Sequence, residues 1–123
     1  MIKVTFALRR RKDLSVEEFH TYWLERHAPL VRRHAEALGI RRYVQSHTVA
    51  TVLDGPLRAV RSLDPEPFDG VAEIYFDSVE AVAGVLTTEQ GQAIGAELVA
   101  DEREFVDLDR SPIWITEEHL IVG

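Results

Sequence analysis

Apolar and polar residues alternate in several short stretches of the chain, which is typical of strands with two unlike faces. Residues 2–9 place Ile2, Phe6 and other apolar side chains on one face. Residues 70–77 show the same period, and residues 40–51 are rich in β-branched and aromatic side chains. A last strand is expected over residues 112–116, with a continuation to residue 122 left open.

After the first strand, apolar residues recur every three or four positions and predict a long helix. Ser15 and Glu18 have the capping-box spacing, in which each side chain bonds to the other residue's backbone N–H. Pro29 lacks an N–H and disfavours helical angles at Ala28. We therefore expect the helix to break or kink near His27 and to resume with Pro29 in its first turn.

The second half of the chain contains two further helical segments. Ser78 is expected to cap a short helix that ends near Val85. Thr87 and Gln90 form a second capping-box pattern, which predicts a helix that ends at about Asp101.

Turn signals interrupt residues 53–70, including the run at 64–67, and predict a long loop. The expected order is strand, helix, strand, loop, strand, helix, strand. This is the split β-α-β arrangement of a ferredoxin-like α+β domain, with an antiparallel four-stranded sheet and both helices on one face. No linker interrupts the sequence, so residues 1–123 are expected to form a single domain.

The second strand carries apolar side chains on both faces, with Ile40 and Val44 on one and Tyr43 and Val49 on the other. Helices cover only one side of such a sheet, and the exposure of apolar surface costs roughly 25 cal/mol per Å². Exposed apolar faces usually mark interfaces. We therefore expect two sheets to pair face to face in a homodimeric α-β barrel.

The composition excludes several classes to which the protein could belong. The 123 residues contain no cysteine, which excludes disulfides and thiolate chemistry. No apolar run approaches the roughly 20 residues of a membrane span, and the first residues lack the pattern of a secretory signal. We expect a cytoplasmic protein without a membrane partner.

The net charge of -7 is unevenly distributed. Residues 1–61 contain 12 basic and 6 acidic side chains, whereas residues 62–123 contain 2 basic and 15 acidic ones. A basic half alone would favour nucleic acid. An acidic half in the same compact domain repels phosphates, so no nucleic-acid partner is expected.

Three histidines, His20, His27 and His34, recur every seven residues within the apolar stripe of the first helix. Two turns of helix separate neighbours by about 10 Å, too far to share one metal ion, so no metal site is expected. We expect His20 and His34 to have structural roles at the edge of the core. His27 lies at the expected helix break. Two roles stay open for it: a packed core residue, or a general acid or base.

His47 shares one strand face with Tyr43 and Gln45. If that face meets the helices, His47 and His27 converge on one pocket; if it meets a partner, His47 is an interface residue. The aromatic residues Tyr22, Trp23 and Trp114 either belong to the core or line a cavity for a planar apolar ligand. No phosphate loop or dinucleotide fingerprint occurs, so no nucleotide cofactor is expected.

The stretch from Leu14 to Val31, with its Ser-x-Glu-Glu-Phe start and its Tyr-Trp and His-Ala-Pro-Leu groups, resembles the signature of the EthD family. The resemblance implies a dimeric α-β barrel for the whole chain, with the ligand pocket between sheet and helices. The family histidine corresponds to His27, and the aromatic pair to Tyr22 and Trp23. His47 matches no motif position.

EthD-like proteins are associated with the degradation of ethers and similar organic compounds, and they are often described as oxidoreductases. The resemblance implies a related role for this chain. Related barrels include cofactor-free monooxygenases, lactone isomerases and polyketide cyclases. We therefore expect a small-molecule-binding protein, as a cofactor-independent oxidoreductase, isomerase or lyase acting on a small apolar compound. His27 and His47 are the candidate catalytic residues, and the pocket residues are expected to be Phe6, Tyr22, Trp23, Tyr43 and Trp114.

Two alternatives stay open: a non-catalytic binding or accessory module with the same pocket, and haem or metal binding through a histidine.

Overall fold

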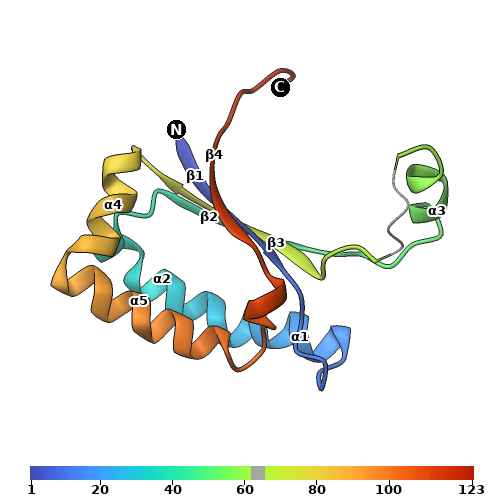
Figure 1. Cartoon of the computed structure of the whole chain (residues 1–123), viewed down its shortest axis with the longest axis horizontal. Helices are drawn as coiled ribbons and strands as arrows, with labels where there is room; N and C mark the ends of the chain where they lie inside the picture. The colour runs from blue at the N-terminus through green and yellow to red at the C-terminus, as the bar shows by residue number, and fades with distance from the viewer. Residues whose placement is uncertain (62–65) are drawn as a thin grey trace.

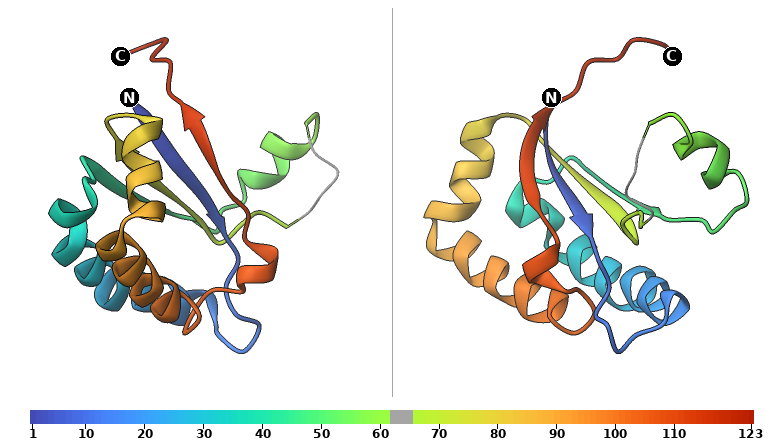
Figure 2. Two further views of the ribbon diagram at one scale, coloured as in Figure 1. Left: turned by 60° about the vertical axis from the view of Figure 1, so that its left-hand side comes forward. Right: turned by 45° about the vertical axis from the view of Figure 1, so that its right-hand side comes forward.

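A computed structural model of the chain describes residues 1–61 and 66–123. Four strands form one antiparallel sheet in the order β2-β3-β1-β4. They are β1 (Ile2–Leu8), β2 (Arg42–His47), β3 (Gly70–Phe76) and β4 (Ile113–Glu117). This strand order, with helices packed on one face of the sheet (Figures 1 and 2), confirms the ferredoxin-like α+β fold.

The helical segments are α1 (Val16–Tyr22), the π-helical turn η1 (Trp23–His27), α2 (Ala28–Leu38), α3 (Asp54–Arg58), α4 (Val79–Thr87), α5 (Glu89–Glu102) and the 3-10 turn η2 (Leu108–Arg110). The segments α1, α2 and α5 run along one face of the sheet, whereas α3 stands apart from this body (Figure 1). The loop expected over residues 53–70 therefore contains a short helix. Part of the turn signal at 64–67 lies outside the described residues.

The helix is irregular near His27, as expected, but it does not break, because the chain stays helical through Pro29. Ala28 has helical angles, with φ −56° and ψ −43°, and its N–H bonds to the carbonyl of Trp23. That five-residue reach makes η1 a π-helical turn. Pro29 follows as the second residue of α2, where a missing N–H is tolerated. A local widening of the helix thus takes the place of a break.

Several boundaries also differ from the sequence prediction. The second strand is shorter than residues 40–51. Helix α5 is capped by Thr88, not Thr87, because the Thr88 side chain accepts a hydrogen bond from the N–H of Gly91. Residues 118–122 do not extend the last strand. The capping box of Ser15 and Glu18 is present, with bonds of 3.0 and 2.9 Å.

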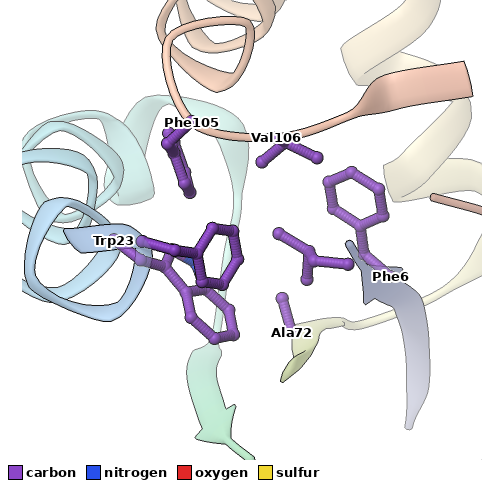
Figure 3. Close-up of a cluster of buried hydrophobic side chains, with 7 residues drawn as sticks. Phe6, Trp23, Ala72, Phe105 and Val106 are labelled. Atoms are coloured by element: carbon purple, nitrogen blue, oxygen red, sulfur yellow. The ribbon is translucent and has the colours of Figure 1, made fainter. Parts of the chain in front are cut away.

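The core fills the space between the sheet and the helices. Its buried members are Phe6, Leu8, Phe19, Trp23, Ala72, Phe105 and Val106, several of which are shown in Figure 3. Gly70 gives the Trp23 ring room: a Cβ at this position would lie 2.7 Å from Cη2 of Trp23 and 2.8 Å from the Ser46 carbonyl oxygen. The close approach of strand and indole therefore requires glycine.

The sheet face turned away from the helices is more polar than the sequence predicts. Lys3 pairs there with Glu73, and Thr5 bonds to Thr116 at 3.0 Å. Trp114 lies on the same face and is 47% exposed. The first strand therefore buries its apolar set under the helices and presents mainly polar groups outward. No helix in the part of the chain that the structure describes is long and apolar enough to cross a membrane.

Candidate functional site

A cavity of about 160 Å³ lies between the sheet and the helices. Its walls are mostly apolar and include Phe6 from β1 and Ile74 from β3. Three polar side chains also line it: His27, Tyr43 and Glu102. An apolar pocket with a few convergent polar groups is the usual form of a small-molecule site.

His27 ends the π-helical turn and is only 5% exposed. Its Nδ1 lies 2.7 Å from Oδ2 of Asp101, in the last turn of α5. A carboxylate only accepts hydrogen bonds, so Nδ1 carries the proton and Nε2 keeps its lone pair. Burial lowers the pKa of His27, an effect that the bond to Asp101 partly offsets. His27 is therefore neutral at neutral pH.

Asp101 is held from two sides, because the Tyr22 hydroxyl donates to its Oδ1 at 2.6 Å. Burial, followed by this hydrogen bond, raises the pKa of Tyr22 to about 12. Tyr22 thus stays protonated and supports Asp101, and it does not line the apolar cavity. The sequence predicts Asp101 only as a helix end, because nothing local connects it with a histidine 74 positions earlier.

The pair His27–Asp101 has the geometry of an oriented general base. The carboxylate fixes the tautomer and the ring orientation of the imidazole. Within residues 1–61 and 66–123, no hydrogen bond engages Nε2 of His27. The imidazole of a residue that lines an apolar cavity therefore retains an available proton acceptor.

Glu102 is the second polar group that sequence reasoning missed. It follows Asp101 directly and lines the same cavity as His27. Burial, and then the neighbouring Asp101, raises the pKa of Glu102 to about 7. The signal in the sequence is its spacing, since Gly91, Ile94, Leu98 and Glu102 share one helical face.

His47 faces the helices, yet it does not reach the cavity of His27. Its ring stacks on Trp23 with centroids 4.5 Å apart and lies 4.6 Å from the ring of His20. Its Nε2 lies 2.8 Å from Oε1 of Gln45. Burial, followed by the nearby His20, lowers the pKa of His47. His47 lines a separate surface hollow next to Tyr43, so the two candidate histidines are not brought together.

The remaining predicted pocket residues divide between the cavity and the far side of the sheet. Phe6, Trp23 and Tyr43 line the cavity. Trp114 does not, because its neighbour Ile113 points inward and Trp114 points to the opposite face.

The other two histidines of the stripe have structural partners. His20 Nε2 lies 2.8 Å from the Asp69 carbonyl oxygen, and His34 Nε2 lies 3.1 Å from Oε2 of Glu97. Outside residues 62–65, no group of three or more histidine, cysteine or acidic side chains is arranged to hold a metal ion.

Several solved structures have a fold similar to that of this chain. An EthD family protein from Bacillus halodurans is 22% identical and superimposes with a TM-score of 0.63, over 97% of this chain and 100% of that one. An EthD-like protein from Ralstonia eutropha is 21% identical with a TM-score of 0.63, over 94% and 89%. A dimeric ferredoxin-like protein from Bacteroides fragilis is 14% identical with a TM-score of 0.59, over 95% of both chains.

No curated protein matches the chain. The EthD domain family, however, matches residues 11–109, which include both the π-helical turn with His27 and the end of α5 with Asp101 and Glu102. The match covers most of the chain, and the similar structures share its fold over nearly their full length. The protein therefore belongs to the EthD domain family.

Proposed function

We propose that this EthD domain is a cofactor-independent enzyme that acts on a small apolar organic compound, with His27 as its proton-transfer residue. One observation carries the proposal: a buried, neutral histidine is oriented by Asp101 beside an apolar cavity. Among the oxidoreductase, isomerase and lyase types, this arrangement favours reactions that begin with removal of a proton from carbon.

The roles follow from the contacts. Asp101 is a positioning residue, since both of its oxygens are engaged by protein groups. Phe6, Trp23 and Tyr43 shape the cavity around the substrate. His47 is not among the described residues that line the cavity of His27, so we assign it no part in the proton transfer.

The size of the cavity limits the substrate. An apolar cavity of about 150 Å³ is large enough to bind benzene. The cavity of this domain, at about 160 Å³, therefore suits one six-membered ring with small substituents. Its mainly apolar lining favours uncharged compounds, because a buried charge without a partner is costly.

We further propose that the domain works as a homodimer that pairs through the outer sheet faces. Similar proteins are described as dimeric. The half-exposed Trp114 on the outer face supplies apolar contact area. The polar groups beside it, such as Lys3 and Glu73, would then form the hydrogen-bonded part of the interface.

The test uses 3-cyclohexen-1-one, an uncharged six-membered ring with acidic C–H groups next to the carbonyl. In D₂O, the wild-type protein is expected to accelerate the exchange of the C2 protons for deuterium, followed by NMR. His27→Asn is expected to abolish this acceleration, and Asp101→Asn to reduce it by about 10²-fold, within the usual range for general acid–base groups.

A positioning role for Asp101 also predicts a changed pH profile, because the imidazole loses the carboxylate that raises its pKa. Catalysis is refuted if the wild-type protein binds the ketone without exchanging its protons. That result identifies a binding or accessory module instead. Unchanged exchange in His27→Asn would remove the histidine from the mechanism.

A further inference from the structure

The inner face of α5 carries a carboxyl group where its pattern calls for an apolar residue. Ile94, Leu98 and Glu102 follow one another at intervals of four, so they lie on the same side of the helix. Leu98 and Glu102 both line the cavity between the sheet and the helices. Glu102 therefore replaces an apolar side chain at a position that faces the proposed ligand.

The two adjacent carboxyl groups at the end of α5 have opposite surroundings. Both oxygens of Asp101 are bound, by Tyr22 and His27. The Glu102 side chain makes no hydrogen bond or ion pair with any described residue. Its carboxyl group is thus available to a ligand in the cavity.

The titratable and charged groups around Glu102 come from three elements. Asp101 and Arg103 are its neighbours in sequence, His27 faces it from η1, and Tyr43 faces it from β2. The cavity-lining residues of β1, β3, α2 and α4 are apolar or aromatic hydrocarbons. Among the described residues, no lysine or arginine lines the cavity, and Arg103 beside Glu102 in the chain is the cation that partly offsets its charge.

Burial favours the neutral form of such a group, and the pKa of Glu102 is accordingly raised to about 7. The end of a helix adds to this effect, since its partial negative charge disfavours a carboxylate. A protonated carboxyl group donates a hydrogen bond, whereas the neutral His27 Nε2 accepts a proton. Pairs of titratable groups with opposite tendencies divide the acid and base roles in enzymes.

We propose that Glu102 is a second catalytic residue, the acid that pairs with His27, and that the cavity takes uncharged ring compounds with a carbonyl group. The Glu102 carboxyl group donates its hydrogen bond to the carbonyl oxygen. This inference rests on the proposed function for its chemistry, whereas the affinity for carbonyl compounds stands on the position of Glu102 alone.

The proton transfers balance without a co-reactant. His27 Nε2 takes the proton from the carbon next to the carbonyl, and the C–H electron pair forms a C=C bond. The former C=O π pair moves to oxygen, which takes the proton of Glu102. In the return step, Glu102 recovers the O–H proton as C=O re-forms, and the far carbon of the dienol takes the proton from His27. A β,γ-unsaturated ketone thereby becomes its α,β-unsaturated isomer.

The first experiment measures binding without turnover. Ligand-observed NMR compares cyclohexanone with methylenecyclohexane, a ring of similar shape without the carbonyl oxygen, at pH 5.5 and 8.5. For the wild-type protein, cyclohexanone affinity is expected to fall about three- to tenfold as pH rises, which is the usual contribution of one hydrogen bond. Methylenecyclohexane affinity is expected to fall at most slightly.

Two variants isolate the carboxyl group. Glu102→Gln keeps a hydrogen-bond donor but does not titrate, so cyclohexanone affinity is expected to be independent of pH. Glu102→Leu completes the apolar stripe of the helix and is expected to remove the preference for the ketone. Glu36→Gln, at an exposed position of α2, makes the same change in charge and is expected to behave as the wild type.

The second experiment follows the isomerisation of 3-cyclohexen-1-one to 2-cyclohexen-1-one by ultraviolet absorbance. Glu102→Gln is expected to lose at least 10²-fold in kcat while it still binds cyclohexanone. The proposal is overturned if wild-type ketone affinity does not depend on pH, if Glu102→Gln keeps that dependence, or if its turnover stays within threefold of wild type.

The outcomes separate this inference from the proposed function. Loss of turnover in His27→Asn together with normal turnover in Glu102→Gln refutes only the role of Glu102. A pH-dependent ketone affinity in a wild-type protein that turns nothing over refutes the enzyme and retains Glu102 as the group that recognises the carbonyl.

Discussion

Replacing Glu102 by glutamine changes the stability of the folded chain in a way that depends on pH. The pKa of this carboxyl group rises from 4.5 to about 7 on folding, chiefly because it is buried at the cavity. The folded state therefore binds more protons than the unfolded state between these values, and wild-type stability falls as pH rises through this window. Glutamine removes the titration while keeping the size of the side chain.

The size of the expected stability difference follows from the pKa shift of Glu102. Each pKa unit corresponds to about 1.4 kcal/mol, so the shift costs the wild-type protein about 3 kcal/mol once Glu102 is ionised. Partial access to solvent reduces this value, and we expect Glu102→Gln to be about 2 kcal/mol more stable than wild type at pH 8. At pH 4.5 the two proteins are expected to differ by less than about 0.5 kcal/mol.

Urea unfolding at both pH values, at one fixed protomer concentration, measures the difference. The lowered pKa of His27 makes stability change in the opposite sense, falling as pH falls, but this contribution is common to both proteins and cancels. Glu36→Gln controls for the change in net charge. The reasoning fails if Glu102→Gln shows the same stability difference at pH 4.5 and 8, or if it is less stable than wild type at pH 8.

Three further predictions test the packing around the site and the assembly. Asp101→Asn is expected to lower the free energy of unfolding by about 1–3 kcal/mol and to move the pKa of Tyr22 from about 12 toward 10, followed by tyrosinate absorbance; an unchanged titration would contradict the hydrogen bond. Gly70→Ala is expected to cost about 1–3 kcal/mol in thermal or urea unfolding, because its Cβ meets the core indole. Gly84→Ala, where a Cβ meets nothing within 4 Å, is the matched control, and equal stability of the two variants would refute the close approach. Trp114→Glu places a charge on the outer sheet face and is expected to shift the protein to monomers in sedimentation at micromolar concentration; a wild-type protein that sediments as a monomer would refute the dimer.

Much of the fold is encoded in local patterns. Alternation over the first strand and the capping box of Ser15 and Glu18 depend only on neighbouring residues, so the order of the elements can be read from the sequence. The motif around His27 likewise lies within one stretch of chain. The sequence places an irregularity before Pro29 but does not fix its form, since a break, a kink and the observed π-helical turn η1 all suit a proline in the first turn of α2.

The sequence by itself determined the element order, the apolar stripe and the single histidine most suited to chemistry. Only the tertiary structure decided what that histidine meets. Asp101 and Glu102 approach His27 because α5 packs alongside the first helical segments, a contact across more than 70 residues that leaves no local trace. The same packing separates His47 from the cavity, although strand alternation had correctly grouped it with Tyr43. Periodicity fixes which side chains share a face, whereas the docking of whole elements fixes which faces meet.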